Sequence, residues 1–233
     1  MCGRATLTNE DFEGIAAELD AEYAAEDAAL YRPRYNIAPS DLHWIVESGA
    51  DRRVLRPAVW GYRASGGRPL INVRGEQVGS GRGFRDAFQG RRCLVVTDGF
   101  FEWDASKAPF WFHRADKKLV LLAGLFQPPA SEAGAPSGPP QPPRPRFTIL
   151  TTQPNRVVAP VHDRMPVIVP PAAIDEWLTA APAAAASLIR SAPDDTLIAT
   201  PVSKRVGSVK NDDPAVLAPP DPEPPKPTQR SLF

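Results

Sequence analysis

Short apolar runs, none of them longer than a strand, place the strongest limit on how this chain of 233 residues folds. The longest run, at residues 118–126, is far below the roughly 20 apolar residues that cross a bilayer, so no membrane span is expected. Runs of strand length and composition recur near residues 42, 54, 92, 109, 118, 146 and 165. They do not alternate regularly with helical segments. The sequence therefore predicts an α+β fold with a mostly antiparallel, barrel-like β core and flanking helices, rather than a doubly wound sheet.

Three segments show helical patterning. Residues 9–30 carry apolar side chains at helical spacing after Thr8 and Asp11, which resemble a capping box, and they predict one amphipathic helix. Two shorter helices are expected in residues 171–180, which open with a proline, and in the Ala-rich run after Pro182.

Proline separates a folded part from two extended segments. Residues 128–145 contain eight prolines among Gly, Ser and Ala, and residues 218–227 repeat proline at short intervals. Such composition favours extended, solvated backbone over a packed core. We therefore expect one domain over residues 1–217, with an inserted loop at 128–145, and a Pro-rich tail over residues 218–233.

The charge is balanced over the whole chain but uneven along it. Lys and Arg together number 27, as do Asp and Glu, so net charge alone gives no reason to expect nucleic acid. Residues 9–27 are acidic without any Lys or Arg, whereas arginines crowd residues 63–92. A basic face beside an acidic helix is therefore expected.

The cysteine content indicates a reducing compartment. Cys2 and Cys93 are too few for a disulfide scaffold, and no basic segment followed by an apolar run opens the chain as a signal peptide would. We expect a cytoplasmic protein. Nothing in the sequence requires a metal, a disulfide or a cofactor.

Cys2 has the most distinctive chemistry. A small residue after the initiator Met usually permits removal of Met1, which turns Cys2 into a 1,2-aminothiol. The amine has an ordinary pKa of about 7.7 to 8.0 and keeps a neutral fraction at neutral pH. An aldehyde that meets this group forms an imine at nitrogen, and sulfur then closes it into a five-membered thiazolidine. Position alone favours a plainer interpretation, in which Cys2 is a small buried residue near the terminus.

Eight motifs, taken in order along the chain, resemble those of one protein family. They are MCGR at residue 1, RYNIAPS at 34–40, WG at 60, NVRGE at 72–76, RRCLVVTDGFFEW at 91–103, LAGLF at 122, FTILTT at 147 and HDRMPVIV at 162–169. Together they resemble the SRAP family, the SOS response-associated peptidase-like proteins, over roughly residues 1–217.

The resemblance implies both a function and a kind of enzyme. The expected protein recognises abasic sites in single-stranded DNA and forms a covalent thiazolidine crosslink between Cys2 and the open-chain sugar aldehyde. The crosslink protects the lesion during replication or an SOS-type damage response. Autoproteolytic removal of Met1, with a lyase side activity, is part of the same expectation.

The resemblance assigns catalytic roles to four residues. Cys2 is the nucleophile, and Asn72 helps to hold the crosslink. Glu102 resembles the carboxylate that moves protons during imine formation, and its aromatic neighbours are expected to raise its pKa by desolvation. His162 resembles the histidine that helps to open the deoxyribose ring. Without the family, Asn72 is a turn residue, Glu102 a strand end and His162 a structural histidine.

Four further residues are expected to contact DNA. Arg4 and Arg74 match family contacts, and a guanidinium forks onto phosphate oxygens. Asn36 and Trp60 match positions near the site, where an exposed indole stacks on an unpaired base. The alternatives are ordinary surface arginines and a core tryptophan.

Other positions leave the path of the DNA less defined than the crosslinking group. Arg91 and Arg92 either add charge beside the DNA backbone or are solvated strand ends. The segment WGYRASGGRPLIN, which begins at Trp60, is shorter and richer in Gly than the family pattern, and Gly207 stands where the family commonly has Asn. We therefore expect a rebuilt DNA-facing loop.

The chain ends in QRSLF, which is similar to the QxxLF peptide that docks bacterial replication and repair proteins on the sliding clamp. We expect Gln229 to be a polar anchor, with Leu232 and Phe233 filling an apolar pocket. The expected partners are single-stranded DNA with abasic sites and the bacterial sliding clamp. A monomeric, nucleoid-associated protein is expected.

Two other classes of function stay open at this point. In the first, the Cys2 thiolate attacks an amide with His162 as base, and the chain is a peptidase or other hydrolase acting in trans. In the second, the chain is a non-catalytic adaptor that binds single-stranded DNA. The hydrolase needs no abasic aldehyde, and the adaptor forms no adduct.

Overall fold

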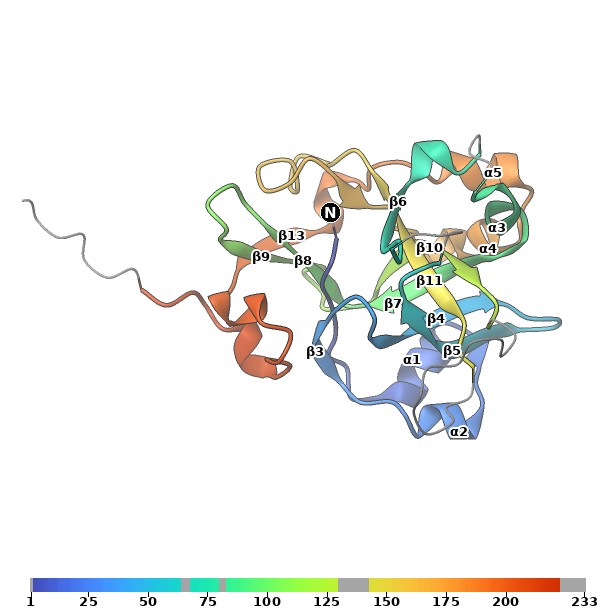
Figure 1. The fold of residues 1–233 in the computed structure, drawn as a ribbon, viewed down its shortest axis with the longest axis horizontal. Helices are drawn as coiled ribbons and strands as arrows, with labels where there is room; N and C mark the ends of the chain where they lie inside the picture. Colours follow the sequence, from blue (N-terminus) through green and yellow to red (C-terminus); the bar gives the residue numbers. More distant parts are fainter. Residues whose placement is uncertain (1, 64–67, 80–82, 130–142, 223–233) are drawn as a thin grey trace, which may run out of the picture.

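The computed structural model describes residues 2–63, 68–79, 83–129 and 143–222. Within these ranges the strands form two sheets (Figure 1). Met1 and the expected clamp-binding residues Gln229, Leu232 and Phe233 lie outside the described residues.

The smaller sheet contains the start of the chain. In spatial order its strands are β13 (Ile198–Pro201), β9 (Pro109–His113), β8 (Gly99–Trp103), β1 (Ala5–Leu7) and β3 (Arg34–Ile37). All neighbours pair antiparallel. Strand β1 is therefore held on both sides, by β8 and by β3, which fixes the N-terminal segment inside a sheet.

The larger sheet supplies most of the core. Its strands, in spatial order, are β12 (Met165–Pro166), β11 (Arg146–Thr152), β10 (Val120–Gln127), β7 (Arg92–Thr97), β4 (Leu42–Ser48), β5 (Arg53–Trp60) and β2 (Ala21–Glu22), and β6 (Asn72–Arg74) pairs with β11. Most pairings are antiparallel, although β5 and β6 lie parallel to β11, and β2 lies parallel to β5. The α+β class with mostly antiparallel pairing is confirmed. Closure of the core into a barrel stays a prediction.

The apolar runs predicted as strands all lie in strands. The last run forms only the two-residue β12, because beyond Pro166 a single bridge from Ile168 to Leu122 joins it to β10. The sequence pattern missed β1, β2, β3, β6, β8 and β13, which have two to five residues each and too little alternation to stand out.

The single helix expected over residues 9–30 is wrong. The chain instead forms α1 (Phe12–Glu18), the short strand β2 and α2 (Ala25–Ala28). Asp20 has a left-handed φ of 46°, a conformation that Asp tolerates better than most residues, and the helix cannot continue through it. The next two residues then pair with β5.

Thr8 binds the Asp98 carboxylate and does not cap the helix. That carboxylate accepts hydrogen bonds from the hydroxyls of Thr6 and Thr8 and from the Thr8 amide. The cap comes from Asp11, whose side chain accepts from the Gly14 amide over 2.8 Å. The capping box expected at Thr8 is therefore wrong.

The two later helices are confirmed. They are α4 (Ile174–Thr179), preceded by a 3-10 turn at Pro171–Ala173, and α5 (Pro182–Ser187); the sequence did not predict α3 (Arg85–Gly90). In Figure 1 these three helices gather at the upper right, and α1 and α2 lie below. No helix within the described ranges is long and apolar enough to cross a membrane.

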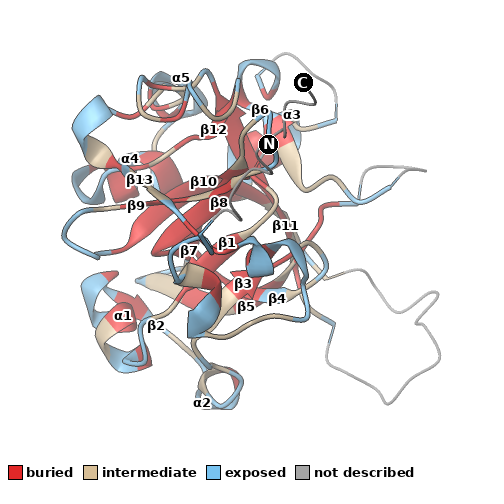
Figure 2. Cartoon of the chain, turned by 90° about the vertical axis from the view of Figure 1, so that its left-hand side faces the viewer, coloured by how far each residue is buried: buried red, intermediate tan, exposed pale blue. Residues whose placement is uncertain are grey.

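Buried side chains fill the space between the sheets and the helices (Figure 2). A second, smaller cluster joins β8 and β9 to two 3-10 turns near the end of the chain, η4 (Lys204–Gly207) and η5 (Pro214–Leu217). Its buried members are Phe101, Trp111, Val202, Val206 and Val216. This packing fixes the C-terminal part of the described chain against β8, the strand that contains Glu102.

Candidate active site around Cys2

The N-terminal segment runs antiparallel beside β8, which brings Cys2 close to Glu102. The Phe101 amide donates to the Arg4 carbonyl over 3.0 Å, as the pairing of β1 with β8 requires. The same register, continued toward the N-terminus, places Gly3 opposite Glu102. Cys2 is 1% exposed, and its thiol is free.

Asn72 reaches Cys2 from the other sheet. It opens β6, and its Nδ2 donates to the Cys2 carbonyl over 2.7 Å. Its Oδ1 is buried and accepts no hydrogen bond within the part of the chain that the structure describes. The Cys2 Sγ lies 3.9 Å from the Arg4 carbonyl oxygen, at the limit of a weak thiol hydrogen bond. Cys2 is therefore held from both sheets, between which Figure 1 marks the N-terminus.

A carboxylate and an imidazole face each other at this site. Glu102 is 3% exposed, and its Oε2 lies 4.0 Å from the Nε2 of the half-buried His162. The His162 Nδ1 lies 3.0 Å from the Arg164 amide nitrogen and 3.0 Å from the exposed Asp163 carboxylate. These contacts fix the ring so that its Nε2 points toward Glu102. No three His, Cys, Asp or Glu side chains of the described ranges gather as metal ligands.

Burial shifts the proton affinities of these groups. It raises the pKa of Glu102 to about 7 and lowers the pKa of His162 below its ordinary value. Glu102 is therefore suited to exchange protons near neutral pH, and burial favours the neutral form of His162 there. Burial, and then the negative charge of Glu102, raise the pKa of the Cys2 thiol well above its ordinary value. The thiol is protonated at neutral pH, so reaction at sulfur needs a base.

An ion pair joins the segment of His162 to the strand of Asn72. Both Nη atoms of the buried Arg164 guanidinium donate hydrogen bonds to the Glu76 carboxylate, at 2.8 and 2.9 Å. Nη2 also donates to the Thr151 carbonyl, at 2.6 Å. Glu76 lies in η1 (Gly75–Gln77), the 3-10 turn that follows β6, and Thr151 lies in β11, which pairs with β6. Sequence reasoning missed this pair because its partners stand 88 residues apart and no periodicity links them.

Arg4 and Asn36 lie together, Asn36 buried and Arg4 half-buried, and protein groups bind both side chains. Asn36 is 0% exposed, and its Nδ2 donates to three backbone carbonyls. Its Oδ1 accepts from an Arg4 Nη over 2.8 Å, and that guanidinium also donates to the Val206 and Gly207 carbonyls. This burial corrects the expected role of Asn36 at the DNA surface, and Arg4 is already engaged with protein acceptors.

Trp60 is a core residue. It is 1% exposed, stacks on Phe147 and donates its indole N–H to the Ile71 carbonyl over 3.0 Å. An indole in this position cannot stack on an unpaired base, which corrects that expectation. Its hydrogen bond instead holds the residue before Asn72, so Trp60 supports the site through the backbone of β6.

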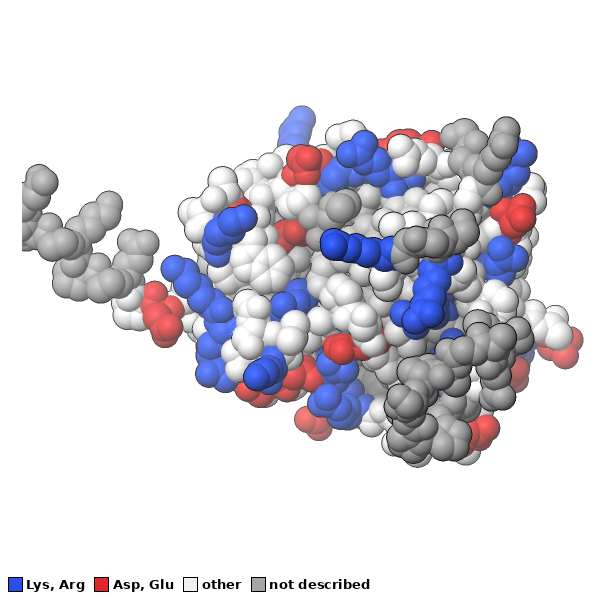
Figure 3. Space-filling view, in the orientation of Figure 1, with Lys and Arg blue, Asp and Glu red and all other residues white. Residues whose placement is uncertain are grey.

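The arginines expected near DNA differ in how far they are exposed. Arg74 is exposed two residues after Asn72, whereas Arg92 is 4% exposed and Arg91 is half-buried. Arg92 donates to carbonyls at the ends of α3 and α4, so it is neither a DNA contact nor a solvated strand end. Figure 3 shows Lys and Arg side chains on both sides of the place where the chain begins, with Asp and Glu among them.

Known proteins with related sequences identify the family of this chain. A family model described as SOS response associated peptidase (SRAP) matches residues 1–209. The Bacillus subtilis abasic site processing protein YoqW is 31% identical in an alignment 230 positions long, which covers 93% of this chain and 99% of that protein. The Escherichia coli abasic site processing protein YedK is 30% identical, over 94% of this chain and 100% of that protein.

Solved structures agree on the fold. A Bacteroides thetaiotaomicron protein superposes with a TM-score of 0.78 at 19% identity, over 94% of this chain and 99% of that chain. A phage-related protein from Bordetella bronchiseptica superposes with a TM-score of 0.67 at 28% identity, over 87% and 95%. The family match spans all four residues that meet at the site, Cys2, Asn72, Glu102 and His162. The chain belongs to the SOS response associated peptidase (SRAP) family.

Proposed function

We propose that this protein recognises abasic sites in single-stranded DNA and captures them covalently through Cys2, once Met1 has been removed. The relatives named above are abasic site processing proteins. The observation that carries the proposal is the position of Cys2, buried between the two sheets beside Glu102 and bound at its carbonyl by Asn72. The resulting thiazolidine protects the lesion during replication and an SOS-type damage response.

The proposed reaction needs no oxidant or reductant. The Cys2 amine attacks the aldehyde carbon of the open-chain sugar, and the carbinolamine loses water to give an imine. The thiol sulfur then bonds to the imine carbon, and the thiol proton passes to the imine nitrogen. Aldehyde and aminothiol thus give thiazolidine and water. Holding the aldehyde at Cys2 replaces a bimolecular encounter with a local reaction.

Glu102 and His162 divide the proton transfers. With a pKa near 7, Glu102 is present in both forms at neutral pH, so it donates a proton to the departing hydroxyl and accepts one from the thiol. His162, held 4.0 Å away, acts on the ring oxygen of the sugar as the ring opens. The neutral imidazole that burial favours is suited to accept and return a proton.

The protonated thiol argues against the hydrolase alternative. A cysteine hydrolase attacks with a thiolate, which requires a lowered pKa. In the chain that still carries Met1, burial and the nearby carboxylate raise the pKa of the Cys2 thiol. The same groups suit a thiol that loses its proton only as it bonds to the imine. Peptidase action is confined in this proposal to the hydrolysis of the Met1–Cys2 bond, and strand cleavage from the imine is a lyase side reaction.

Arg74 is the residue proposed to bind the DNA backbone. Arg74 is exposed in β6, two residues after Asn72, and a guanidinium forks onto phosphate oxygens. The protein is proposed to act as a monomer in the cytoplasm, on nucleoid DNA. The domain boundary at residue 217 also stays a prediction.

The sliding clamp is the second proposed partner. QRSLF carries the Gln anchor and the Leu-Phe pair at the end of a Pro-rich tail. Deletion of residues 229–233 is expected to abolish capture by immobilised clamp while leaving crosslink yield unchanged. The matched control is Ser231→Ala, which alters a residue between the anchors. Equal clamp capture by the deleted and full chains would rule the interaction out.

A denaturing gel separates the three functions. Purified chain is mixed with single-stranded DNA with and without an abasic site, and beside it with an unrelated peptide. Wild-type protein is expected to shift only the abasic DNA; Cys2→Ala should abolish the adduct, and Cys2→Ser should keep only a reversible imine. Cys93→Ala, which removes the other thiol, is expected to crosslink normally. Equal heat-stable adduct from Ser and Cys would refute the thiazolidine step.

A further inference from the structure

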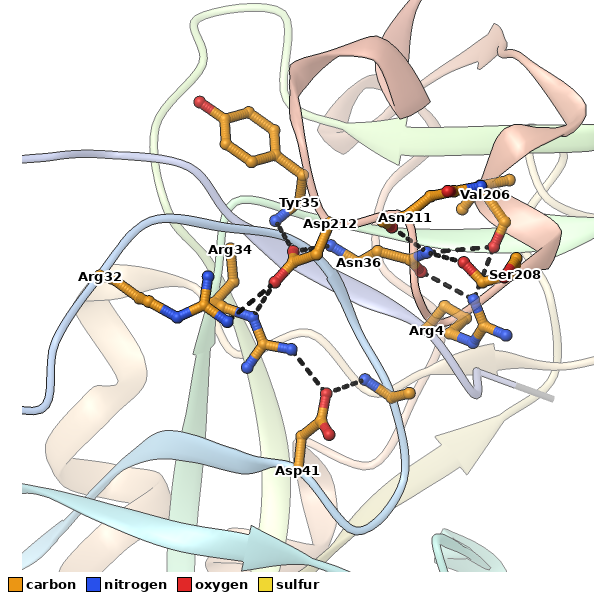
Figure 4. A network of polar contacts seen from close by, with 11 residues as sticks. Arg4, Arg32, Arg34, Tyr35, Asn36, Asp41, Val206, Ser208, Asn211 and Asp212 are labelled. Carbon is orange, nitrogen blue, oxygen red and sulfur yellow. Dashed lines mark hydrogen bonds and ion pairs between the residues drawn. The ribbon is translucent and has the colours of Figure 1, made fainter.

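The carboxylate of Asp212, near the end of the described chain, binds β3, the strand beside β1. Asp212 accepts from the backbone amides of Tyr35 and Asn36, at 2.7 and 2.9 Å. Its other oxygen pairs with the Arg34 guanidinium and, at 3.2 Å, with that of Arg32 (Figure 4). Burial opposes ionisation of Asp212, but the Tyr35 amide and the Arg34 charge outweigh it and lower its pKa. Asp212 is therefore charged at neutral pH.

Asn36 connects this strand to the N-terminal segment. Its Nδ2 donates to the carbonyls of Val206, Ser208 and Asn211, at 3.2, 3.0 and 2.7 Å, while its Oδ1 accepts from Arg4. The same Arg4 nitrogen donates to the Val206 carbonyl at 2.6 Å. In Figure 4 a dashed line joins the Asn36 side chain to the Arg4 guanidinium, next to Val206, Ser208 and Asn211. The place of Arg4 is thus set by residues some 200 positions away in the sequence.

Arg4 in turn limits where Cys2 lies. The Arg4 carbonyl faces both the Cys2 thiol, at 3.9 Å, and the Phe101 amide of β8, at 3.0 Å. Gly3, the one residue between Cys2 and Arg4, has no side chain to fix its own backbone. A shift of Arg4 therefore moves the thiol relative to Glu102.

We propose that residues 203–217, named here the C-terminal clasp, position Cys2 for crosslinking, with Asp212 as the residue that holds the clasp to β3. The proposal rests on the proposed function of Cys2. Asn211 and Asp212 lie just beyond residue 209, where the family match ends. Asp212 is a positioning residue, since it acts through Asn36 and Arg4.

Asp212→Asn in the full chain tests the clasp, with Asp213→Asn as the matched control. Asp213 is the adjacent residue and undergoes the same chemical change, but it accepts from the Ala215 amide and forms an exposed ion pair with Arg205, at 3.2 Å, and neither partner lies in β3. Two rates are measured. One is alkylation of Cys2 by iodoacetamide, assigned by peptide mass; the other is crosslinking at saturating abasic single-stranded DNA.

The expected result is selective. Asp212→Asn should accelerate Cys2 alkylation several-fold and slow crosslinking about tenfold, because small misplacement of a reacting group lowers its rate steeply. Binding of undamaged single-stranded DNA should change less than about twofold. Asp212→Glu, which keeps the charge, should recover part of the crosslinking rate. Arg34→Lys should shift both rates in the same direction by less, and serves if Asp212→Asn melts too low to assay.

Several results would overturn the inference. Equal rates for Asp212→Asn and Asp213→Asn would do so. So would equal acceleration of alkylation at Cys2 and at the fully buried Cys93, since that indicates general loosening. Should the wild-type chain form no crosslink, the proposed function fails, and the ratio of alkylation at Cys2 to that at Cys93 still decides whether the clasp holds Cys2.

Discussion

Glu102, at the scale of the single residue, is an ionisable group kept in the interior at the expense of stability. Its pKa is about 7 in the folded chain because it is buried, against an ordinary value of about 4.3 when unfolded. Below pH 4 both states are protonated and nothing is lost. As pH rises from 4.3 to 7, the unfolded chain ionises first, so the folded state loses stability, and above pH 7 the loss is complete.

Glu102→Gln is therefore expected to stabilise the fold and impair the chemistry. At pH 8 the gain in unfolding free energy should be about 4 kcal/mol, and it should vanish at pH 4. The crosslinking rate should fall about 100-fold, because a general acid–base group is lost. Thermal melting at the two pH values and single-turnover crosslinking measure this. Glu176→Gln, an exposed change on α4, should alter neither; a destabilised Glu102→Gln at pH 8 would contradict the assignment.

Single residues differ in how far the sequence reveals them. Aromatic neighbours in GFFEW predicted a raised pKa for Glu102, and its burial agrees. Trp60 and Asn36 were expected at the DNA surface because they match family positions. A motif records which residue is present and not which way its side chain points, and both are buried.

At the scale of the element, Arg92 joins the ends of two helices, α3 and α4, that lie far apart in the chain. Its guanidinium donates to the carbonyls of Phe88 and Gln89 at the end of α3, and to those of Trp177, Leu178 and Ala180 at the end of α4. The last carbonyls of a helix have no partner within it, so one buried cation satisfies both ends.

Removing this cation is expected to weaken the fold. Arg92→Met keeps the apolar stem but leaves buried carbonyls without donors, which should reduce the unfolding free energy by about 3 kcal/mol. Arg85→Met, at an exposed position at the start of α3, should change it by less than about 0.5 kcal/mol. Urea unfolding followed by circular dichroism compares them. Similar midpoints for the two variants would show that the carbonyls find other donors.

Elements were predictable where the pattern is local. Apolar runs of strand length gave β4, β5, β7, β9, β10 and β11, and prolines at first-turn positions marked α4 and α5. The helix over residues 9–30 was wrong because apolar spacing cannot reveal a left-handed residue such as Asp20 or a strand partner such as β5. Strands of three residues, β1 and β6 among them, gain their stability from neighbours that the local sequence does not contain.

At the scale of the whole molecule, the site joins four segments that lie far apart in the chain. Cys2 comes from the N-terminal segment, Asn72 from β6, Glu102 from β8 and His162 from the segment before β12. The resemblance to SRAP motifs predicted this set of residues. The contacts that hold the set together, Glu76 with Arg164 and Asp212 with β3, depend on sheet pairing across the molecule and could not be predicted from spacing.

The same arrangement explains why a terminal residue is suited to this chemistry. A chain end is usually mobile, yet here β1 is paired on both sides and Cys2 is bound from both sheets. Removal of Met1 would expose an amine whose position is already fixed. The order of the whole fold thus supplies the local concentration on which the proposed capture depends.

The central claim is tested most directly by the intact mass of the protein after incubation with a single-stranded oligonucleotide that carries one abasic site. The account predicts a chain without Met1 that gains the mass of the oligonucleotide less one water, and a digest in which the added mass lies on the peptide that begins at Cys2. A chain with its N-terminal Cys2 fully exposed that gains no mass, or gains it on another peptide, would contradict the account.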